Sequence, residues 1–405
     1  MGKTILLIGA FDTKGEEYAF IQRIILSRGH DTLALHIGVF DADPSMHVDV
    51  SNADVARAGG TPIGEIQDRK DRGEAMKVMS DGTAKVVRQL YEEGRFDGAI
   101  GMGGTGGTSV ITAGMQSLPI GVPKVMVSTA ASGDTSTYVG TRDIAMFPSV
   151  VDVAGVNRIS RPIFTRAAGA ICGMVESEPE ESTDERPILA ASMFGNTTEC
   201  VDRCREALTE KGYEVLVFHA TGTGGKTMES LVDDGLIEAV LDITTTEWAD
   251  EICGGVFSAG PTRLDAPGKA GIPHLIVPGC IDMANYGPRD TVPDKFNDRL
   301  LYEWNPSVTL MRTNAEENRL MGEIFAKKIN AATGPVAVLI PLKGVSILDG
   351  DGEMFCDREA DQAMFDALKS NLRDDIRVVE IDHNINDEAF STKAVEMMLE
   401  LIAKR

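Results

Sequence analysis

The sequence predicts an α/β protein of two lobes, each with a mainly parallel sheet flanked by helices. At 405 residues, the chain is longer than a single hydrophobic core usually supports. Short apolar runs alternate with helical patterns in both halves, as in βαβ units. Residues 176–185 between the halves are polar and mostly acidic, as in an interdomain linker. We therefore expect a first lobe at 1–178, a linker at 179–186 and a second lobe at 187–405.

The apolar runs and helical patterns place the elements of both lobes. In the first lobe we expect strands at 3–10, 31–39, 96–104 and 123–129, and helices at 15–28 and 74–93. In the second lobe we expect strands at 186–192, 213–220, 237–245, 273–279, 335–341 and 376–382, and helices at 197–211, 227–234, 314–331, 359–371 and 387–404. Ligands of open parallel sheets bind beyond the carboxyl ends of the strands, so polar residues at those ends are the first candidates for a site.

Composition and charge narrow the class of function. The formal net charge of -23 is spread along the chain, which favours solubility and argues against nucleic acid as a partner. We find no apolar run long enough to span a membrane and no export signal, so we expect a cytoplasmic protein without a membrane contact. The scattered cysteines are expected to be reduced.

A glycine-rich loop at 101–109 is the strongest candidate for a ligand site. Closely spaced glycines let backbone N–H groups approach an anion, and the N-terminus of the following helix adds unpaired donors. We expect this loop and the neighbouring strand ends to bind phosphates, and Thr108 or Ser109 to supply a magnesium ligand. The alternative is a tight turn without a ligand. The predicted nucleotide-binding residues are Asp12, Thr13, Gly101, Gly103, Gly104, Thr105, Gly106, Gly107, Thr108, Ser128 and Thr129.

The same loop contains the spacing G-x-G-x-x-G, which by itself suggests a dinucleotide site. That motif belongs on the first strand of its unit, with an acidic residue about twenty positions onward. Here the corresponding stretch, 123–129, contains no acid. Nicotinamide binding is therefore disfavoured.

A second glycine loop, at 220–227, ends like a P-loop but has Ala220 where the motif requires the leading glycine. Two interpretations stay open: a second anion site, or a structural turn with a solvated Lys226. Under the first interpretation, Gly222, Gly224 and Gly225 contribute to substrate binding.

Further polar residues of the second lobe are candidates for chemistry. Asp242, Thr245 and Glu247 lie at the end of a predicted strand, where they either bind a substrate or cap the next helix. Cys280 and Asp282 follow another strand, where the thiol is either a nucleophile or a buried neutral group. Arg263 and Arg289 suit carboxylate or phosphate recognition. The predicted catalytic residues are Asp242, Glu247, Cys280 and Asp282, and the predicted substrate-binding residues include Thr245, Arg263 and Arg289.

Four longer strings resemble a known family. They are GMGGTGGTS at 101–109, the segment 117–152, LDITTTEWAD at 241–250 and PGCIDMANYGPR at 278–289. Together they resemble uncharacterised protein family 0261, which includes the ATP-binding inhibitory domain of a tomato mosaic virus resistance protein, and the likeness runs from Ile8 to about residue 355. The resemblance implies two Rossmann-like subdomains, a nucleotide with magnesium near the first glycine loop, and assembly into dimers.

We therefore expect an ATP-binding protein, and favour an ATP- and Mg²⁺-dependent phosphotransferase or ligase-like enzyme acting on a small carboxylated or hydroxylated metabolite. In this interpretation Asp242 or Glu247 assists acceptor binding or proton removal. The alternatives are a non-catalytic module in which ATP fixes lobe orientation or homodimer assembly, and a nucleotide-independent hydrolase or lyase that uses the region from Cys280 to Arg289.

Overall fold

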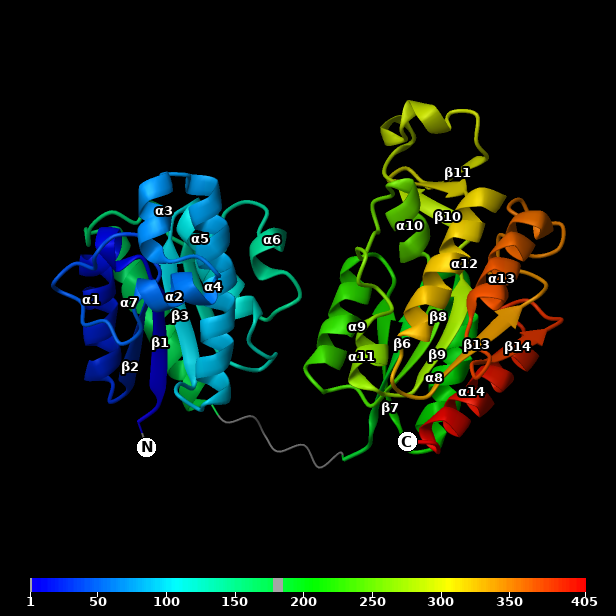
Figure 1. Ribbon diagram of the computed structural model, residues 1–405, viewed down its shortest axis with the longest axis horizontal. Helices are drawn as coiled ribbons and strands as arrows, with labels where there is room; N and C mark the ends of the chain where they lie inside the picture. Colours follow the sequence, from blue (N-terminus) through cyan, green and yellow to red (C-terminus); the bar gives the residue numbers. More distant parts are fainter. Residues whose placement is uncertain (1, 178–184) are drawn as a thin grey trace. The chain divides into compact units, whose positions relative to one another are not determined.

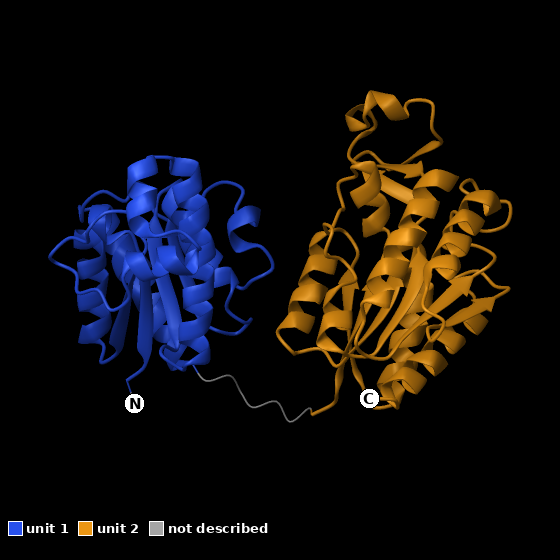
Figure 2. Cartoon of the chain, viewed as in Figure 1, with its two compact units in different colours: residues 1–181 blue, residues 182–405 orange. Residues whose placement is uncertain are grey.

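A computed structural model describes residues 2–177 and 185–405, and the chain divides into two compact units, 1–181 and 182–405 (Figure 2). The predicted linker, 179–186, falls mainly outside the described ranges. Each unit contains a parallel sheet flanked by helices and has its own hydrophobic clusters. The predicted fold class is therefore confirmed.

Unit 1 is built on one sheet in which every strand pairs in parallel with its neighbours, in the order β2-β1-β3-β4-β5 (Figure 1). Successive side chains of β1 point to opposite faces. Ile5 and Leu7 pack against α1 and α7, whereas Leu6 and Ile8 pack in the cluster that contains α2, α4 and α5. Burial on both faces explains why the strands are continuous apolar runs.

The strands of unit 1 are β1 (Thr4–Gly9), β2 (Asp31–His36), β3 (Gly98–Gly103), β4 (Lys124–Ser128) and β5 (Ala145–Pro148). Its helices are α1 (Phe11–Ser27), α2 (Asn52–Ala58), α3 (Ile63–Arg69), α4 (Arg72–Glu92), α5 (Thr105–Gln116), α6 (Ser136–Val139) and α7 (Ser160–Glu176). Helix α1 begins earlier than predicted, because the chain enters the helix directly after β1.

Unit 2 contains a larger parallel sheet in the order β14-β13-β9-β8-β6-β7 (Figure 1). It also contains an antiparallel sheet, β10-β12-β11, which the sequence patterns did not predict. The strands of this small sheet are only four or five residues long and carry polar residues such as Asn285, Glu303 and Thr309. Short strands of this kind give little periodic signal.

The parallel strands of unit 2 are β6 (Ile188–Met193), β7 (Glu214–His219), β8 (Ala239–Thr244), β9 (His274–Gly279), β13 (Val336–Pro341) and β14 (Arg377–Ile381), and the antiparallel strands are β10 (Met283–Tyr286), β11 (Leu301–Asn305) and β12 (Val308–Arg312). Its helices are α8 (Thr198–Glu210), α9 (Thr223–Asp233), α10 (Glu247–Cys253), α11 (Ala266–Ala270), α12 (Ala315–Asn330), α13 (Arg358–Asn371) and α14 (Glu388–Ile402), with 3-10 turns η1 (Gly195–Thr197), η2 (Arg289–Thr291) and η3 (Asp294–Phe296). None of the helices in the described ranges is both long and apolar enough to cross a membrane.

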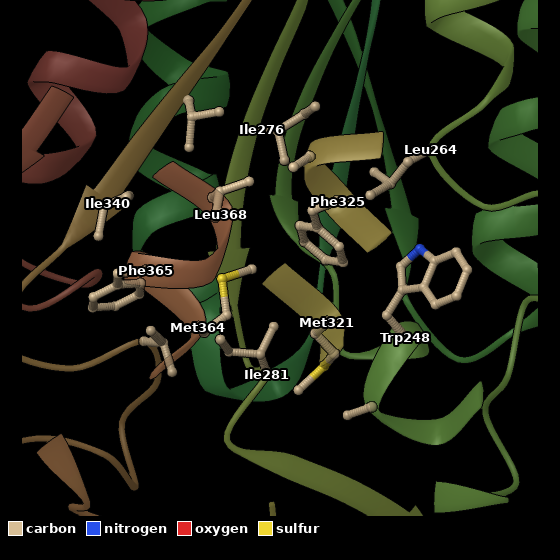
Figure 3. Close-up of a cluster of buried hydrophobic side chains, with 14 of the residues drawn as sticks. Trp248, Leu264, Ile276, Ile281, Met321, Phe325, Ile340, Met364, Phe365 and Leu368 are labelled. Carbon is tan, nitrogen blue, oxygen red and sulfur yellow. The ribbon is translucent and has the colours of Figure 1, made fainter. Parts of the chain in front are cut away.

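One core of unit 2 lies where α10, α12 and α13 meet the large sheet (Figure 3). Trp248 of α10 packs edge-on against Phe325 of α12, with ring centroids 6.4 Å apart. The indole N–H of Trp248 donates to the carbonyl oxygen of Arg263 at 3.2 Å, so its polar atom is satisfied. This hydrogen bond also fixes the backbone of the loop that carries Arg263.

Tyr18 of α1 holds together the ends of β1 and β3, where the glycine-rich loop begins. Its hydroxyl donates to the carbonyl oxygen of Ile8 at 2.5 Å and accepts from the N–H of Met102 at 2.7 Å. The ring is buried beside Gly9, where a Cβ atom would lie 2.2 Å from the tyrosine ring. Gly9 is therefore required for space, and the hydroxyl satisfies two backbone groups of the sheet.

We predict that Tyr18→Phe destabilises the protein by about 1 to 3 kcal/mol, because it leaves a buried carbonyl and a buried N–H with one partner fewer. Urea unfolding of the full chain measures this loss. Tyr91→Phe is the matched control, since no hydrogen bond of the Tyr91 hydroxyl occurs in the described ranges, and it should change stability by less than about 0.5 kcal/mol. Equal effects of the two changes would contradict the role given to Tyr18.

Candidate functional site

The candidate site lies at the carboxyl edge of the unit 1 sheet, where β3 leads into α5. Gly101 and Gly103 are buried within the strand. A Cβ atom on Gly101 would lie 2.4 Å from a methyl group of Ile111, and one on Gly103 would lie 3.2 Å from the backbone of Gly107. Both glycines therefore allow α5 to pack closely on the strand. The structure thus gives Gly101 and Gly103 a packing role.

Among the described residues, no side chain caps the N-terminus of α5. Gly104 is the N-cap residue, and the N–H groups of Thr105, Gly106 and Gly107 have no acceptor inside the helix. Within the described ranges, a Cβ atom on Gly107 would meet no atom within 4 Å. The helix is 12 residues long, so its dipole adds to these donors. This end of α5 has the unpaired donors and the space that an anion requires.

The hydroxyl groups near this helix end are engaged within the protein. Thr108 is buried, and its Oγ1 donates to the carbonyl oxygen of Gly104 at 2.9 Å and lies 2.7 Å from Oγ of Ser128. Oγ of Ser128 also accepts from the N–H of Ala130 at 2.9 Å. Ser109 donates to the carbonyl oxygen of Thr105. Both hydroxyl groups thus stabilise the first turn of α5 by donating to backbone carbonyls.

A cavity of about 620 Å³ opens beside the start of α5. Gly106 and Gly107 form part of its wall, and α3, α4 and the loop after β2 form most of the remainder. Apolar side chains such as Ile37, Phe40 and Met76 line it. Its volume lies within the usual range for small-molecule sites. The uncapped helix end and the apolar cavity thus form one continuous site within unit 1.

Arg72, the first residue of α4, brings a positive charge to this site. It lines the cavity, and a Cβ atom on Gly106 would lie 3.5 Å from its Nη2 atom. Among the described residues, its guanidinium has no hydrogen-bond or ion-pair partner. Lys70 lines the same cavity, and its backbone has a left-handed conformation. Sequence reasoning missed both residues, although two basic residues at the junction between helical segments were a usable signal.

Asp12 contributes a carboxylate to the lining of the same cavity. Its Oδ2 accepts from the N–H of Phe40 at 3.1 Å, whereas its Oδ1 is buried without a hydrogen-bond partner in the part of the chain that the structure describes. Thr13 is exposed at the cavity and bonds only to the preceding turn in these ranges. The structure thus brings Asp12 and Thr13 to the same cavity as Gly106 and Gly107.

A smaller cavity, of about 330 Å³, lies at the ends of β4 and β5 in the same unit. Hydroxyl groups and one carboxylate line it, from Thr129, Ser132, Ser149 and Asp152. A Cβ atom on Gly104 would lie 3.8 Å from Oγ1 of Thr129, so this cavity approaches the N-cap of α5. In the described ranges no group of three or more His, Cys, Asp or Glu side chains is placed to hold a metal ion.

The second glycine loop, in unit 2, already holds an anionic side chain. The N–H groups of Gly222 and Gly225 donate to Oε1 of Glu247 at 2.8 and 3.0 Å. A Cβ atom on Gly225 would lie 2.2 Å from Oε2 of the same carboxylate. Glu247 therefore occupies the N-terminus of α9, where a phosphate would bind. Of the two open interpretations, the geometry favours the structural turn.

Glu247 belongs to a buried network centred on Arg263. Nε of Arg263 donates to Oε2 of Glu247 at 2.6 Å, and Nη1 and Nη2 donate to the two oxygens of Asp242 at 2.6 and 2.5 Å. Burial raises the pKa of Glu247, whereas for Asp242 the Arg263 charge outweighs burial and holds the pKa well below its ordinary value. Thr245 is also buried and donates to the carbonyl oxygen of Val277. These predicted catalytic and substrate-binding residues are therefore interior and mutually satisfied.

The other predicted catalytic residues of unit 2 are buried as well. Cys280 is fully buried, and burial raises the pKa of its thiol well above the ordinary value. Its φ of 57° lies in the left-handed region, which is unusual for a residue other than glycine. Asp282 accepts from the hydroxyl of Ser346 at 2.8 Å, and its Oδ1 has no partner in the described ranges. The thiol matches the neutral buried alternative, and Arg289 lies apart from both, exposed on η2.

Asp282, Asp349 and Asp361 surround Arg312 in a buried acidic cluster. Burial raises the pKa of Asp282 to about 6, although Arg312 opposes the shift. Burial and the two other carboxylates raise the pKa of Asp349 to about 8. Arg312 donates to Asp361 at 2.7 Å and to Asp349 at 3.4 Å. Arg358 also pairs with Asp349 at 3.1 Å and with Asp361 at 2.8 Å, so the cluster contains three carboxylates and two guanidinium groups. The excess of carboxylates over guanidinium groups favours a bound proton near neutral pH.

The protein thus consists of two α/β units, each with a mainly parallel sheet. In the first unit a cavity adjoins the N-terminus of α5. The chain belongs to the UPF0261 family: the model of the uncharacterised protein family (UPF0261) N-terminal domain matches residues 3–180, and that of its C-terminal domain matches residues 186–402. The family suggested by the four sequence strings is therefore confirmed.

The matches to related proteins cover nearly the whole chain. A UPF0261 protein of Clostridium tetani is 46% identical over 405 residues, which covers 100% of both chains. The ToMV resistance protein Tm-1(GCR237) of Solanum lycopersicum is 39% identical, and the match covers 99% of this chain and 56% of that protein. The glycosyltransferase SnogD of Streptomyces nogalater is similar at 10% identity with a TM-score of 0.21, covering 100% of this chain and 99% of that one. A TM-score this low supports no conclusion about function.

We predict that Arg263→Met destabilises unit 2 by about 3 to 5 kcal/mol, because the change leaves Asp242 and Glu247 buried without their cation. Thermal and urea unfolding of the full chain report the loss. Arg289→Met, at an exposed arginine, serves as the control and should remain within about 0.5 kcal/mol of the parent. A stable Arg263→Met variant would contradict the structural role of the network.

We also predict that folding stability decreases as the pH rises from about 4 to 8. The folded state keeps protons on Asp282 and Asp349, whereas the unfolded chain releases them near its ordinary aspartate pKa of about 4. Asp349→Asn should make the slope of unfolding free energy against pH shallower between pH 5 and 8, by up to about 1.4 kcal/mol per pH unit. Asp366→Asn, at an exposed helix position, should leave the slope unchanged. Chemical denaturation at a series of pH values measures both slopes.

Proposed function

We propose that unit 1 binds ATP, with the phosphates at the N-terminus of α5 and the nucleoside in the cavity beside it. The observation that carries this proposal is the junction of the two features: a cavity of about 620 Å³ with Gly106 and Gly107 in its wall. A cavity alone would suit many apolar ligands, and an uncapped helix alone would suit any anion. Together they favour a ligand with an apolar ring at one end and a negative charge at the other.

The charges around the site support a phosphorylated ligand. The N–H groups at the start of α5 and the guanidinium of Arg72 approach the same point, since Nη2 of Arg72 lies 3.5 Å from a Cβ built on Gly106. Arginine binds phosphate through two parallel hydrogen bonds, and helix N-termini bind it through backbone donors. Lys70 adds a second positive charge at the cavity wall.

The apolar part of the cavity supports a nucleoside. Phe40 is 64% exposed although it lies in the cavity wall, and Ile66 and Met79 form a buried floor. An exposed aromatic ring at a cavity offers a surface on which a base can stack. Gln67 adds an amide that can form hydrogen bonds with ring nitrogens or exocyclic groups.

Asp12 fits a magnesium ion better than the hydroxyl residues that we predicted. Its Oδ1 is a buried oxygen without a partner in the described ranges, and its side chain lines the cavity. Mg²⁺ is commonly held by one or two carboxylates together with phosphate oxygens and water. Bound magnesium would offset the negative charge of the phosphates, which Asp12 and Asp71 would otherwise repel.

The second cavity of unit 1 supports an enzymatic role. Its hydroxyl-rich wall contains Thr129, Ser132, Ser149 and the carboxylate of Asp152, and it approaches the N-cap of α5. A small hydroxylated metabolite bound there would lie close to the proposed phosphate position. We therefore propose phosphoryl transfer to such an acceptor, with Asp152 as the group that accepts the proton of the attacking hydroxyl.

We predict that Arg72→Gln weakens Mg²⁺–ATP binding about ten-fold, because it removes a charge-assisted hydrogen bond to phosphate. Isothermal titration calorimetry of the full chain measures the affinity. Lys77→Gln is the control, since Lys77 is an exposed cation of α4 that pairs with Asp81 outside the cavity, and its change should leave the affinity intact. No binding of Mg²⁺–ATP by the parent protein would refute the proposal.

Measuring the turnover of ATP distinguishes an enzyme from a non-catalytic module. ADP release is measured with the parent protein and with Asp152→Asn across a panel of small polyols and hydroxy acids. Acceptor-dependent release that falls at least ten-fold in Asp152→Asn supports phosphoryl transfer. ATP binding that changes only the oligomeric state, followed by light scattering, supports a module in which the nucleotide controls homodimer assembly.

A further inference from the structure

A cavity in unit 2 is lined by aromatic and apolar side chains together with a few uncharged polar ones. It measures about 220 Å³ and is formed at the ends of β6 and β7 and along the small antiparallel sheet. Phe194, His219, Phe257 and Trp304 provide its aromatic surfaces. No Asp, Glu, Lys or Arg occurs among the described residues that line it. This cavity uses none of the residues that we assigned to nucleotide or substrate binding.

The aromatic rings are held in a defined arrangement. The ring of Phe194 lies 5.5 Å from that of His219 and 6.1 Å from that of Phe257, tilted by 55° and 66°. Trp304 packs edge-on against Tyr302 at 6.1 Å on β11, while its own side chain remains 44% exposed. An indole that is fixed by a neighbour and still exposed at a cavity is available for stacking.

The backbone around the cavity is fixed by hydrogen bonds. The N–H of Phe257 donates to the buried carboxylate of Asp250 at 3.1 Å. The N–H of Phe194 donates to Oγ1 of Thr197 at 3.2 Å. The carbonyl oxygen of Asn196 accepts from the side-chain amide of Asn386 at 2.9 Å. A ligand would thus meet a wall that is already ordered, which reduces the entropy lost on binding.

Hydrogen-bonding groups of the cavity wall are left free. In the described part of the chain, neither ring nitrogen of His219 has a hydrogen-bond partner. His219 is exposed, so its ring nitrogens are accessible to a ligand, whereas the unpartnered Oδ1 of Asn196 is buried. The cavity therefore offers apolar surface for a ring and polar atoms for one substituent, but no charge that would balance an ionised ligand.

We propose that this cavity of unit 2 binds an uncharged aromatic compound of one ring, or two fused rings, that carries a hydrogen-bonding group. The ring packs among Phe194, Phe257 and Trp304, and the polar group meets His219. The size agrees with this class, since a dry cavity of about 150 Å³ accommodates benzene. The proposal is independent of ATP binding, because it concerns residues of the other unit.

Benzamide is a suitable probe, because it combines one ring with an uncharged amide. Saturation-transfer NMR with the full chain should detect binding of benzamide to the parent protein. Benzoate has the same ring with a negative charge, and we expect it to bind at least ten-fold more weakly. Toluene has the ring without the polar group and measures the apolar contribution alone.

Variants locate the binding in the cavity. Trp304→Ala and Phe257→Ala should each weaken benzamide about five-fold, the factor that one aromatic contact is worth. His219→Phe should weaken benzamide but leave toluene unchanged. Leu236→Ala removes an exposed apolar side chain elsewhere in unit 2, and His383→Phe removes an exposed imidazole, so both should bind benzamide like the parent.

Two results would overturn the proposal. One is the absence of benzamide binding to the parent at tens of millimolar. The other is parent-like binding by Trp304→Ala, which is expected to fold because this side chain lies at the surface. If Phe257→Ala unfolds, as judged by circular dichroism, Trp304→Ala and His219→Phe still decide the outcome.

Discussion

A helix that starts directly behind a parallel strand begins with backbone N–H groups that have no acceptor inside the helix. In both units a helix with such unpaired N–H groups follows a glycine-rich loop: α5 in unit 1 and α9 in unit 2. In unit 2 the carboxylate of Glu247 accepts from Gly222 and Gly225. In unit 1 no side chain of the described ranges caps the helix. The same loop chemistry therefore leads to an internal structural contact in one unit and to unpaired backbone donors in the other.

The contact between Glu247 and the N-terminus of α9 determines which polar groups pair in the interior of unit 2. A buried Glu247 requires a cation, which Arg263 supplies, and the remaining donors of Arg263 require Asp242. The carbonyl oxygen of Arg263 in turn accepts from the indole of Trp248, which packs in the core shown in Figure 3. Polar network and apolar core thus stabilise each other. This dependence explains why residue types that resemble a catalytic set are found in the protein interior.

In unit 1 the uncapped helix is combined with features from distant parts of the chain. The cavity wall takes Asp12 from the first turn of α1, Phe40 from the loop after β2, and Arg72 from the start of α4. The parallel order β2-β1-β3 brings the loops after these strands to one edge of the sheet. Tyr18 fixes this edge by bonding to the backbone of both β1 and β3.

The sequence by itself determined the α/β class and the strands of both parallel sheets except β5, because apolar runs and helical periods are local signals of burial and β5 is only four residues long. It also located the first glycine loop, and the cavity beside it includes the predicted Asp12, Thr13, Gly106 and Gly107. It did not predict β10, β11 and β12, whose short, partly polar strands have no strong period.

Only the tertiary structure decided which polar residues are free and which are already paired. Asp242 lies within β8, Glu247 begins α10 and Arg263 lies in a loop, yet long-range contacts turn these three side chains toward one another. Packing also brings Arg72 beside Gly106, which is distant in the chain. In the same way it gathers Phe194, Phe257 and Trp304 around one cavity. Local pattern records whether a side chain is polar or apolar, whereas its partner is set by how distant segments pack.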